Sequence, residues 1–178
     1  MSDYGELIAP GAIRFTRLLP GPIERVWAYL VEPDKRAKWF AGGPMDLREG
    51  GKVELEFRHS DLSAEPPPPE AGGYESTETA EVVRIDPPRL LVLNWHDVSG
   101  GEAGYSVVAF ELAQQGDKVL LTLTNSRIAG RGNLVSVGGG WHAHLGVLED
   151  VLEGREPRFF WQTYHARHAD YDQRIAKD

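Results

Sequence analysis

The sequence predicts an α+β fold in which an antiparallel sheet packs against one long helix near the C-terminus. Two observations support this class. Segments in which apolar and polar residues alternate recur along the chain, and short turns rich in Gly, Pro and Asp separate those between residues 77 and 125. Short connections favour antiparallel pairing, because parallel neighbours need a long crossover. The one long helical pattern follows the last of these strands.

The length and composition are those of a single globular domain. The chain has 178 residues, of which 41% are hydrophobic and 26% are charged. A chain of this size builds one hydrophobic core without splitting. We therefore expect one domain over residues 1–178, with its core at about 13–154 and a helical extension at about 155–178.

The charge and the cysteine count exclude several classes of function. The formal net charge of -8 repels phosphate backbones, so nucleic acid is not expected as a partner. No run reaches the roughly 18 apolar residues of a membrane span, and the N-terminus lacks the pattern of a signal peptide. We expect no membrane partner and a cytoplasmic location. The absence of cysteine excludes disulfides, thiolate nucleophiles and Cys-ligated metal centres.

The first elements are a strand and two short helices. Apolar and polar residues alternate over Ile13–Leu19, and the Pro-Gly-Pro sequence that follows ends this strand. Pro33 begins the second helix, which we expect to end near Trp39 and Phe40. The first helix is predicted by apolar residues at the i, i+3, i+4 and i+7 spacing of one helical face, namely Ile23, Val26, Trp27 and Leu30.

Five further strands follow. The clearest is Lys52–His59, in which Val53, Leu55 and Phe57 lie on one face and charged residues on the other. A Pro-rich loop at 60–76 comes next, and it is either a mobile lid or a tolerated insertion. The remaining strands are expected at Thr77–Ile85, Arg89–His96, Tyr105–Leu112 and Lys118–Asn125.

The long helix is expected to begin at an N-cap, Asn133, and to run to Leu152, with Gly154 as its C′ glycine. Three glycines at 138–140 each cost on the order of 1 kcal/mol inside a helix. Either this backbone closely approaches the sheet or a ligand, or the helix begins later, near Trp141. The stripe that should face the sheet consists of Trp141, Leu145, Leu148 and Leu152.

A last helical segment is expected over roughly Arg158 to Ala176. It contains the aromatic residues Phe159, Phe160, Trp161, Tyr164 and Tyr171. Large aromatic side chains bury much area, so this segment should dock either on the domain itself or on a second copy in a homodimer.

Four stretches carry a resemblance to a known family. They are PGPIERVWAYLVEPDKRAKWFAGG, LREGGKVELEF, DPPRLLVLNW and GGWHAHLGVLEDVLEG, in this order. The chain resembles the START-like or Bet v 1-like (SRPBCC) superfamily, and within it bacterial proteins similar to the C-terminal domain of the activator of Hsp90 ATPase. The resemblance implies a helix-grip fold, in which a curved sheet wraps around the long helix and encloses a hydrophobic cavity.

The resemblance implies several functions without choosing among them, since one fold serves many activities. Characterised relatives include lipid and hormone carriers, polyketide cyclases and cochaperone domains. The full cochaperone has a separate N-terminal domain that nothing before Ile13 replaces, so Hsp90 is not expected as a partner. Asn125 stands where many relatives have a histidine.

The candidate ligand-binding residues are those expected on the two walls of the cavity or at its mouth. A small-molecule site needs apolar walls and a few polar groups that orient the ligand. The alternative for each residue is packing in a dry core, or for the polar ones a surface or structural role. The candidates are Trp39, Phe40, Val53, Leu55, Phe57, Trp95, His96, Leu121, Leu123, Asn125, Trp141, His144, Leu145 and Leu148.

Histidines could contribute chemistry at two places. His142 and His144 lie about 160° apart around the helix, so at most one faces the cavity, and His144 is nearer the apolar stripe. A solvated or rim position is the interpretation we favour for His144. The spacing of His165, His168 and Asp172 could approximate a metal site, but we expect neither a metal nor another cofactor.

Three hypotheses for the function follow. The first is a non-catalytic carrier or sensor of an apolar or aromatic small molecule. The second is an enzyme of the polyketide cyclase, dehydratase or hydrolase type, with His144 or His96 as general acid or base and Asn125 polarising a carbonyl. The third is a cochaperone-like interaction domain of a stress response.

Overall fold

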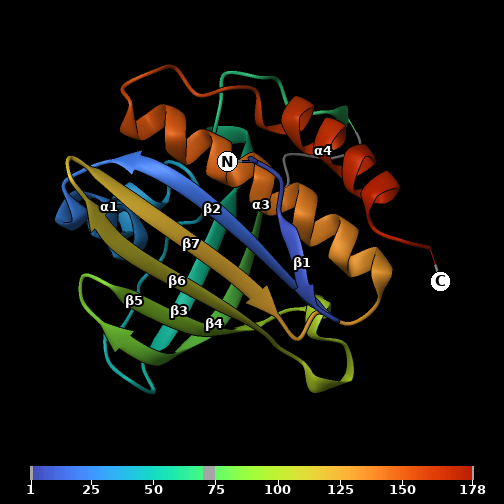
Figure 1. The fold of residues 1–178 in the computed structure, drawn as a ribbon, viewed down its shortest axis with the longest axis horizontal. Coiled ribbons are helices and arrows are strands. Elements are labelled where there is room, and N and C mark those ends of the chain that lie inside the picture. The colour runs from blue at the N-terminus through green and yellow to red at the C-terminus, as the bar shows by residue number, and fades with distance from the viewer. Residues whose placement is uncertain (1, 70–74, 178) are drawn as a thin grey trace.

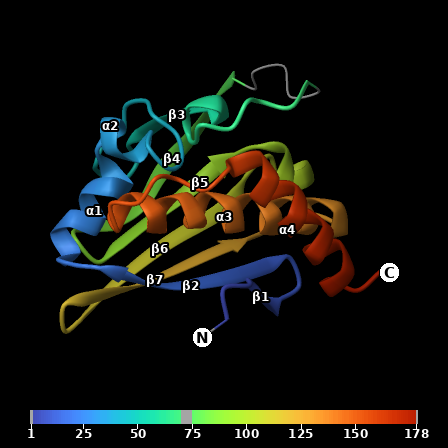
Figure 2. The same cartoon turned by 90° about the horizontal axis from the view of Figure 1, so that it is seen from above.

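A computed structural model describes residues 2–69 and 75–177. Seven antiparallel strands form one sheet in the order β1-β2-β7-β6-β5-β4-β3, and the sheet curves around the long helix α3 (Figures 1 and 2). The predicted α+β class is confirmed. The strands are β1 Glu6–Ala9, β2 Ala12–Pro20, β3 Lys52–Arg58, β4 Glu75–Asp86, β5 Leu90–His96, β6 Ser106–Gln115 and β7 Lys118–Ser126.

Within residues 2–69 and 75–177, four α-helices accompany the sheet, and short 3₁₀ segments lie in connections between strands. None of the described helices is long and apolar enough to cross a bilayer. In Figure 1, α4 lies alongside α3, and α1 lies at the opposite end of the molecule from the C-terminus. The helices are α1 Ile23–Val31, α2 Pro33–Arg36, α3 Arg131–Leu152 and α4 Phe160–Arg174, and the 3₁₀ segments are η1 His59–Asp61 and η3 Val98–Ala103.

The strand β1 was not predicted. It has four residues, all exposed, and it pairs only with β2 at the edge of the sheet. An exposed edge strand needs no alternation of apolar and polar residues, so its sequence carries no period-two signal. The six strands expected from alternation are all present, with ends that differ by at most three residues.

Two helix boundaries differ from the sequence prediction. The helix α3 begins at Arg131, and its N-cap is Gly130 rather than Asn133. Asn133 instead donates from Nδ2 to the carbonyl of Ala129, at 2.7 Å. The helix α2 ends at Arg36, before Trp39 and Phe40. Gly154 ends α3 as predicted, since its φ of 71° is a conformation that glycine adopts without strain.

Two of the three glycines in the middle of α3, Gly138 and Gly139, are explained by α4. A Cβ atom at Gly138 would lie 3.0 Å from the ring of Tyr171, and one at Gly139 would lie 3.1 Å from the backbone nitrogen of His168. The helix is continuous through these residues, so the alternative of a start near Trp141 is wrong. Close approach of a second helix, rather than of the sheet, is the reason for small residues here.

The aromatic C-terminal segment docks on its own domain. Phe160 and Tyr171 are buried, and the hydroxyl of Tyr171 accepts a hydrogen bond from the backbone of Gly5 at 2.8 Å. The helix α4 also has an acceptor at its start. The carboxylate of Glu65, in the long loop, accepts from the backbone nitrogens of Trp161 and Gln162. Part of that loop is therefore fixed to α4, while its residues 70–74 lie outside the described residues.

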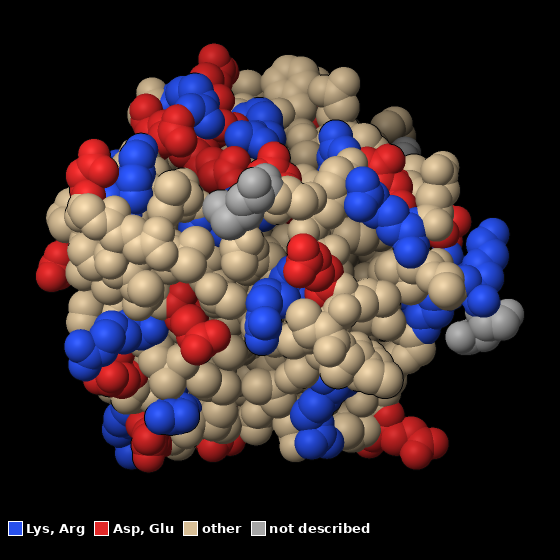
Figure 3. Space-filling model, viewed as in Figure 1, with Lys and Arg blue, Asp and Glu red and all other residues tan. Residues whose placement is uncertain are grey.

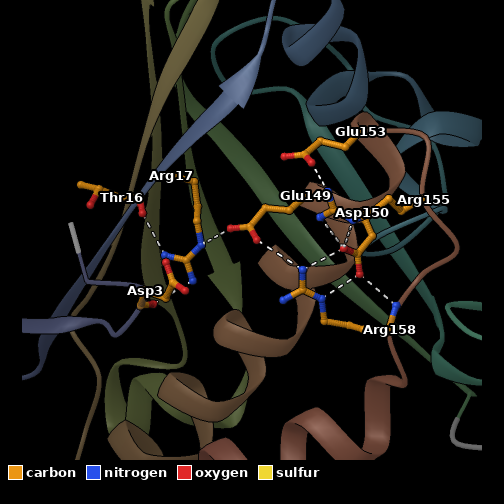
Figure 4. Close-up of polar contacts among 8 residues, drawn as sticks. All are labelled: Asp3, Thr16, Arg17, Glu149, Asp150, Glu153, Arg155 and Arg158. Atoms are coloured by element: carbon orange, nitrogen blue, oxygen red, sulfur yellow. Dashed lines mark hydrogen bonds and ion pairs between the residues drawn. The ribbon is translucent and has the colours of Figure 1, made fainter.

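Charged side chains are interspersed on the face shown in Figure 3. One group of charged side chains lies between β2, α3 and the segment before α4 (Figure 4). Arg17 on β2 lies 2.6 Å from a carboxylate oxygen of Glu149 on α3. The next residue, Asp150, accepts hydrogen bonds from Arg158 and Arg155, both at 2.8 Å. Burial raises the pKa of Asp150, but these bonds outweigh it and hold the pKa well below its usual value. The network joins the sheet, α3 and the segment before α4.

Candidate ligand-binding site

A cavity of about 220 Å³ lies between the sheet, η3 and the first half of α3. Its wall combines aromatic rings with polar groups, which is the composition typical of small-molecule sites. The aromatic residues are Phe40, Phe57, Trp95 and Trp141; the imidazoles are His59 and His144; the carboxylates are Glu78 and Asp97; and the other polar residues include Ser76, Ser99, Asn125, Asn133 and Ser136.

The aromatic rings come from four separate parts of the chain and support one another. Phe40 stacks on Trp141 of α3, with ring centroids 5.0 Å apart. Phe57 of β3 stacks on Trp95 of β5 at 5.8 Å. The two stacked pairs meet edge to face: the ring centroids of Phe40 and Trp95 lie 5.6 Å apart, and their planes are inclined at 88°. Offset and edge-to-face contacts of this kind hold the rings in fixed orientations.

Asn125 fixes the orientation of Trp141. The indole nitrogen of Trp141 donates to Oδ1 of Asn125 at 2.9 Å, and Nδ2 of Asn125 donates to the carbonyl of Val107 at 3.1 Å. Asn125 is 1% exposed, so burial removes the hydrogen bonds that its amide would form with water. The bonds to Trp141 and Val107 replace them. The residue serves first as a support for the cavity wall.

His144 is buried, which corrects the interpretation of a solvated or rim histidine. Its Nδ1 lies 2.8 Å from the carbonyl of Trp39, and a carbonyl only accepts, so Nδ1 carries the proton. Burial, together with the nearby His59, lowers the pKa of His144 to about 3. The ring is therefore neutral at pH 7, and it lines the cavity as a hydrogen-bond acceptor and an apolar surface.

His142 points to a different part of the molecule, in agreement with the angle predicted from the helix. Its Nδ1 is hydrogen-bonded to the hydroxyl of Tyr171 at 3.1 Å. Burial, with the charges of Arg17 and Arg167, lowers the pKa of His142 to about 4. The two imidazoles do not converge on one ligand.

The carboxylate of Glu78 was missed by the sequence analysis. Ser76, Glu78 and Ala80 lie on the inner face of β4, and Oε2 of Glu78 accepts a hydrogen bond from the indole of Trp95 at 2.6 Å. Burial, and then the charge of Asp97, raise the pKa of Glu78, although the indole bond opposes them. The alternation along β4 would have placed Glu78 on the same face as Ala80 and Val82, which was the available signal.

Asp97 and the segment η3 form the rim of the cavity. Oδ1 of Asp97 accepts from the backbone nitrogen of Ser99 at 3.2 Å and from its hydroxyl at 2.6 Å. These bonds fix the start of η3. Val98, the next residue, is 87% exposed at the cavity mouth, so the rim presents an apolar side chain to solvent.

Comparison with known proteins places the chain in a family. The sequence profile of the family described as Activator of Hsp90 ATPase homolog 1-like protein matches residues 20–153, most of the chain. The chain belongs to this family. A protein of Bordetella parapertussis, solved by NMR in solution, is 44% identical over 99% of this AHSA1-like chain and 92% of its own, with a TM-score of 0.84.

More distant structures share the fold of this AHSA1-like protein. CalU16 from Micromonospora echinospora is 23% identical, over 96% of this chain and 93% of its own, with a TM-score of 0.68. DynU16, a protein of the dynemicin biosynthetic locus, is 21% identical, over 83% of this chain and 49% of its own, with a TM-score of 0.64. At these identities the likeness concerns the Bet v 1-like helix-grip fold alone. Among curated proteins, no match was found.

The structure brings six of the predicted site residues of this AHSA1-like protein to the cavity. They are Phe40, Phe57, Trp95, Asn125, Trp141 and His144. Seven others are buried in the core and do not line it, because the side chains nearer the cavity cover them. These are Trp39, Val53, Leu55, Leu121, Leu123, Leu145 and Leu148, each at most 1% exposed.

His96 lies on the opposite face of the sheet from the cavity. Successive side chains of a strand point to opposite faces, and Trp95 points inward. His96 is exposed, with Nδ1 3.3 Å from the hydroxyl of Thr79 and its ring near Tyr105. His96 is therefore excluded from the acid–base set suggested from the sequence, whereas its alternative, His144, lines the same cavity as Asn125.

The helical group in α4 that resembled a metal site is used in other ways. The carboxylate of Asp172 forms an ion pair with Arg131 at 2.8 Å, and the ring of His165 packs against Trp161 and Tyr164. Over residues 2–69 and 75–177, no group of three His, Asp or Glu side chains is arranged to hold a metal ion.

Proposed function

We propose that this AHSA1-like protein binds a small apolar or aromatic molecule in the cavity between the sheet and α3, as a carrier or sensor. The observation that carries the proposal is the cavity itself, walled by Phe40, Phe57, Trp95 and Trp141. Apolar walls with a few polar groups are the usual composition of ligand sites. The walls are held by stacking and by the bond from Trp141 to Asn125, so the site is formed before a ligand arrives.

The volume limits the size of the ligand. A cavity of roughly 150 Å³ in another protein holds benzene, and larger ligand pockets range from about 300 to 1,000 Å³. The 220 Å³ found here suits one aromatic ring with a short substituent. A four-ring polyketide would need rearrangement of the wall.

The state of the histidines favours binding over acid–base catalysis. A general base works best when its pKa lies near the working pH, and the pKa of His144 is about 3. Its Nδ1 is also committed to the carbonyl of Trp39. These properties suit a wall residue better than a proton carrier.

The position of Glu78 in the cavity wall favours a second candidate function, an enzyme of the cyclase, dehydratase or hydrolase type. A carboxyl group whose pKa is raised inside an aromatic cavity has the properties of a general acid or base. The two candidates differ in the fate of the ligand, which a carrier releases unchanged and an enzyme converts.

Titration with 2-phenylethanol, followed by calorimetry and by NMR of the indole N–H groups, tests the proposal. We expect saturable binding, with shifts of the Trp95 and Trp141 signals and none of Trp27, which lies on α1 away from the cavity. Native mass spectrometry of the purified protein and chromatography of the released ligand complete the test. Failure of all one-ring probes to bind would contradict a binding function, and conversion of the ligand would favour the enzyme.

A further inference from the structure

Glu78 has a free hydrogen-bonding capacity directed at the cavity. Its Oε2 accepts from the indole of Trp95 at 2.6 Å, and among the described residues no donor is bonded to Oε1. A carboxylate offers about four lone-pair sites, so one neutral bond leaves most of its capacity unused. The carboxylate is half-buried in the cavity wall, where it is less well hydrated than a carboxylate in bulk water.

No Lys or Arg side chain lies in the described wall of the cavity. The charge that acts on Glu78 is that of Asp97, which has the same sign. Of the two imidazoles in the wall, His144 is neutral at pH 7, because its pKa is about 3, and His59 stacks on Phe57. Among the described residues, the carboxylate of Glu78 therefore has no ion pair, and its bonded donor is the neutral indole of Trp95.

The same molecule shows how it compensates carboxylates elsewhere. Glu149 lies 2.6 Å from Arg17, and Asp150 accepts from Arg155 and Arg158 (Figure 4). A half-buried carboxylate without such a partner costs free energy, and a cationic group that arrives with a ligand removes this cost. Among the described residues of the cavity wall, Glu78 has no arginine partner of the kind that Glu149 and Asp150 have.

We propose that the cavity selects ligands in which an aromatic ring carries a protonated amine, with Glu78 as the counter-charge. The ring packs among Phe40, Phe57 and Trp141, and the ammonium group donates to the open oxygen of Glu78. Aromatic faces also attract cations, so the two kinds of wall favour the same ligand. This inference rests on the proposed function, because it names the chemical class of the ligand.

Three probes that share a phenylethyl group and differ in its polar end separate the contribution of charge from that of the ring. They are 2-phenylethylamine, 2-phenylethanol and 3-phenylpropionate, titrated into the purified full chain by calorimetry at pH 7. A charge-assisted hydrogen bond is stronger than a neutral one, so we expect the amine to bind about tenfold more tightly than the alcohol. The acid should bind most weakly, and the preference for the amine should fall with added salt.

The variant Glu78→Gln removes the charge and keeps an oxygen that accepts the Trp95 indole. We expect it to bind the amine and the alcohol with similar affinities. Glu81→Gln, on the exposed face of the same strand, makes the same charge change away from the cavity and should keep the tenfold preference. Circular dichroism of both variants checks that the fold is retained.

The outcomes separate this inference from the proposed function. If the alcohol binds and the amine binds no more tightly, the inference is overturned and the binding function stands. If Glu78→Gln keeps the preference, Glu78 is not the counter-charge and the inference is also overturned. If none of the three probes binds, both proposals fail.

Discussion

Trp141 and Asn125 are joined by a hydrogen bond of 2.9 Å from the indole nitrogen to Oδ1, across the space between α3 and β7. The bond links the helix to the sheet at the wall of the cavity. The acceptor, Asn125 of β7, is almost completely buried. Its Nδ2 also donates to the carbonyl of Val107 on β6. Three elements of the fold therefore meet at Asn125.

Asn125→Leu should lower the free energy of unfolding by about 2 kcal/mol, because it leaves a buried indole N–H and a carbonyl without partners. Urea denaturation measures the loss. Trp141→Phe removes the same donor, so the double variant should lose less than the sum of the two single variants. Additive losses would show that the bond contributes nothing to stability.

Gly140→Leu should fill the cavity and abolish binding of 2-phenylethanol without destabilising the fold. Gly140 lines the cavity, and a Cβ atom there meets nothing within 4 Å. Replacing a mid-helix glycine also removes a cost of about 1 kcal/mol, so the unfolding midpoint should stay equal or rise.

Gly132→Leu is the matched control for this substitution. Gly132 lies on the same helix and also has open space around it, but it is not a cavity residue. This variant should bind 2-phenylethanol as the unchanged chain does. Equal binding by the Gly140 variant would place the ligand outside the cavity.

The buried state of His144 should make stability depend on pH. The pKa of His144 in the folded chain is about 3, whereas an unfolded histidine binds its proton near pH 6.5. The unfolded chain therefore binds more protons between these values, and the free energy of unfolding falls as the pH decreases through this window. From pH 7 to pH 4 this one group should contribute a loss of roughly 3 kcal/mol.

His144→Gln removes the titrating group, so the stability difference between this variant and the unchanged chain should shrink as the pH falls from 7 to 4. Denaturation at a series of pH values measures it. A constant difference for His144→Gln would show that His144 takes up its proton at the same pH in the folded and the unfolded chain.

Asp150→Asn should destabilise the protein by about 2 kcal/mol, because Arg155 and Arg158 lose charged hydrogen bonds to a carboxylate that is 4% exposed. Thermal denaturation at neutral pH measures the effect. Glu153→Gln changes an exposed partner of Arg155 and should cost less than 0.5 kcal/mol, as roughly expected for surface pairs. Equal effects of the two substitutions would contradict the role of burial.

Much of the fold could be predicted because its signals are local. Alternation along Lys52–Arg58 and the apolar stripe of α1 depend only on neighbouring residues, and both elements are present. The stripe of Trp141, Leu145 and Leu148 is buried as the helical period required. The edge strand β1 has no such signal, since its residues are exposed and its pairing depends on β2.

The candidate site was predicted only in part, for a related reason. Local patterns indicated which side chains face inward, but not which inward side chains border empty space. Leu145 and Leu148 share a helix face with Trp141, yet only Trp141 reaches the cavity. Glu78 was passed over because a charged residue in an alternating strand is usually on the wet face, although alternation along β4 places it on the face of Ala80 and Val82.

The sequence by itself determined the class of fold, the order of its elements and the face that each presents to the core. These properties follow from periodicities of two and 3.6 residues, which each segment carries alone. The tertiary structure decided which polar side chains are buried and with what partners. His142, Gly138 and Asn125 acquire their roles from α4 and from neighbouring strands, because burial and hydrogen bonding depend on residues distant in the chain.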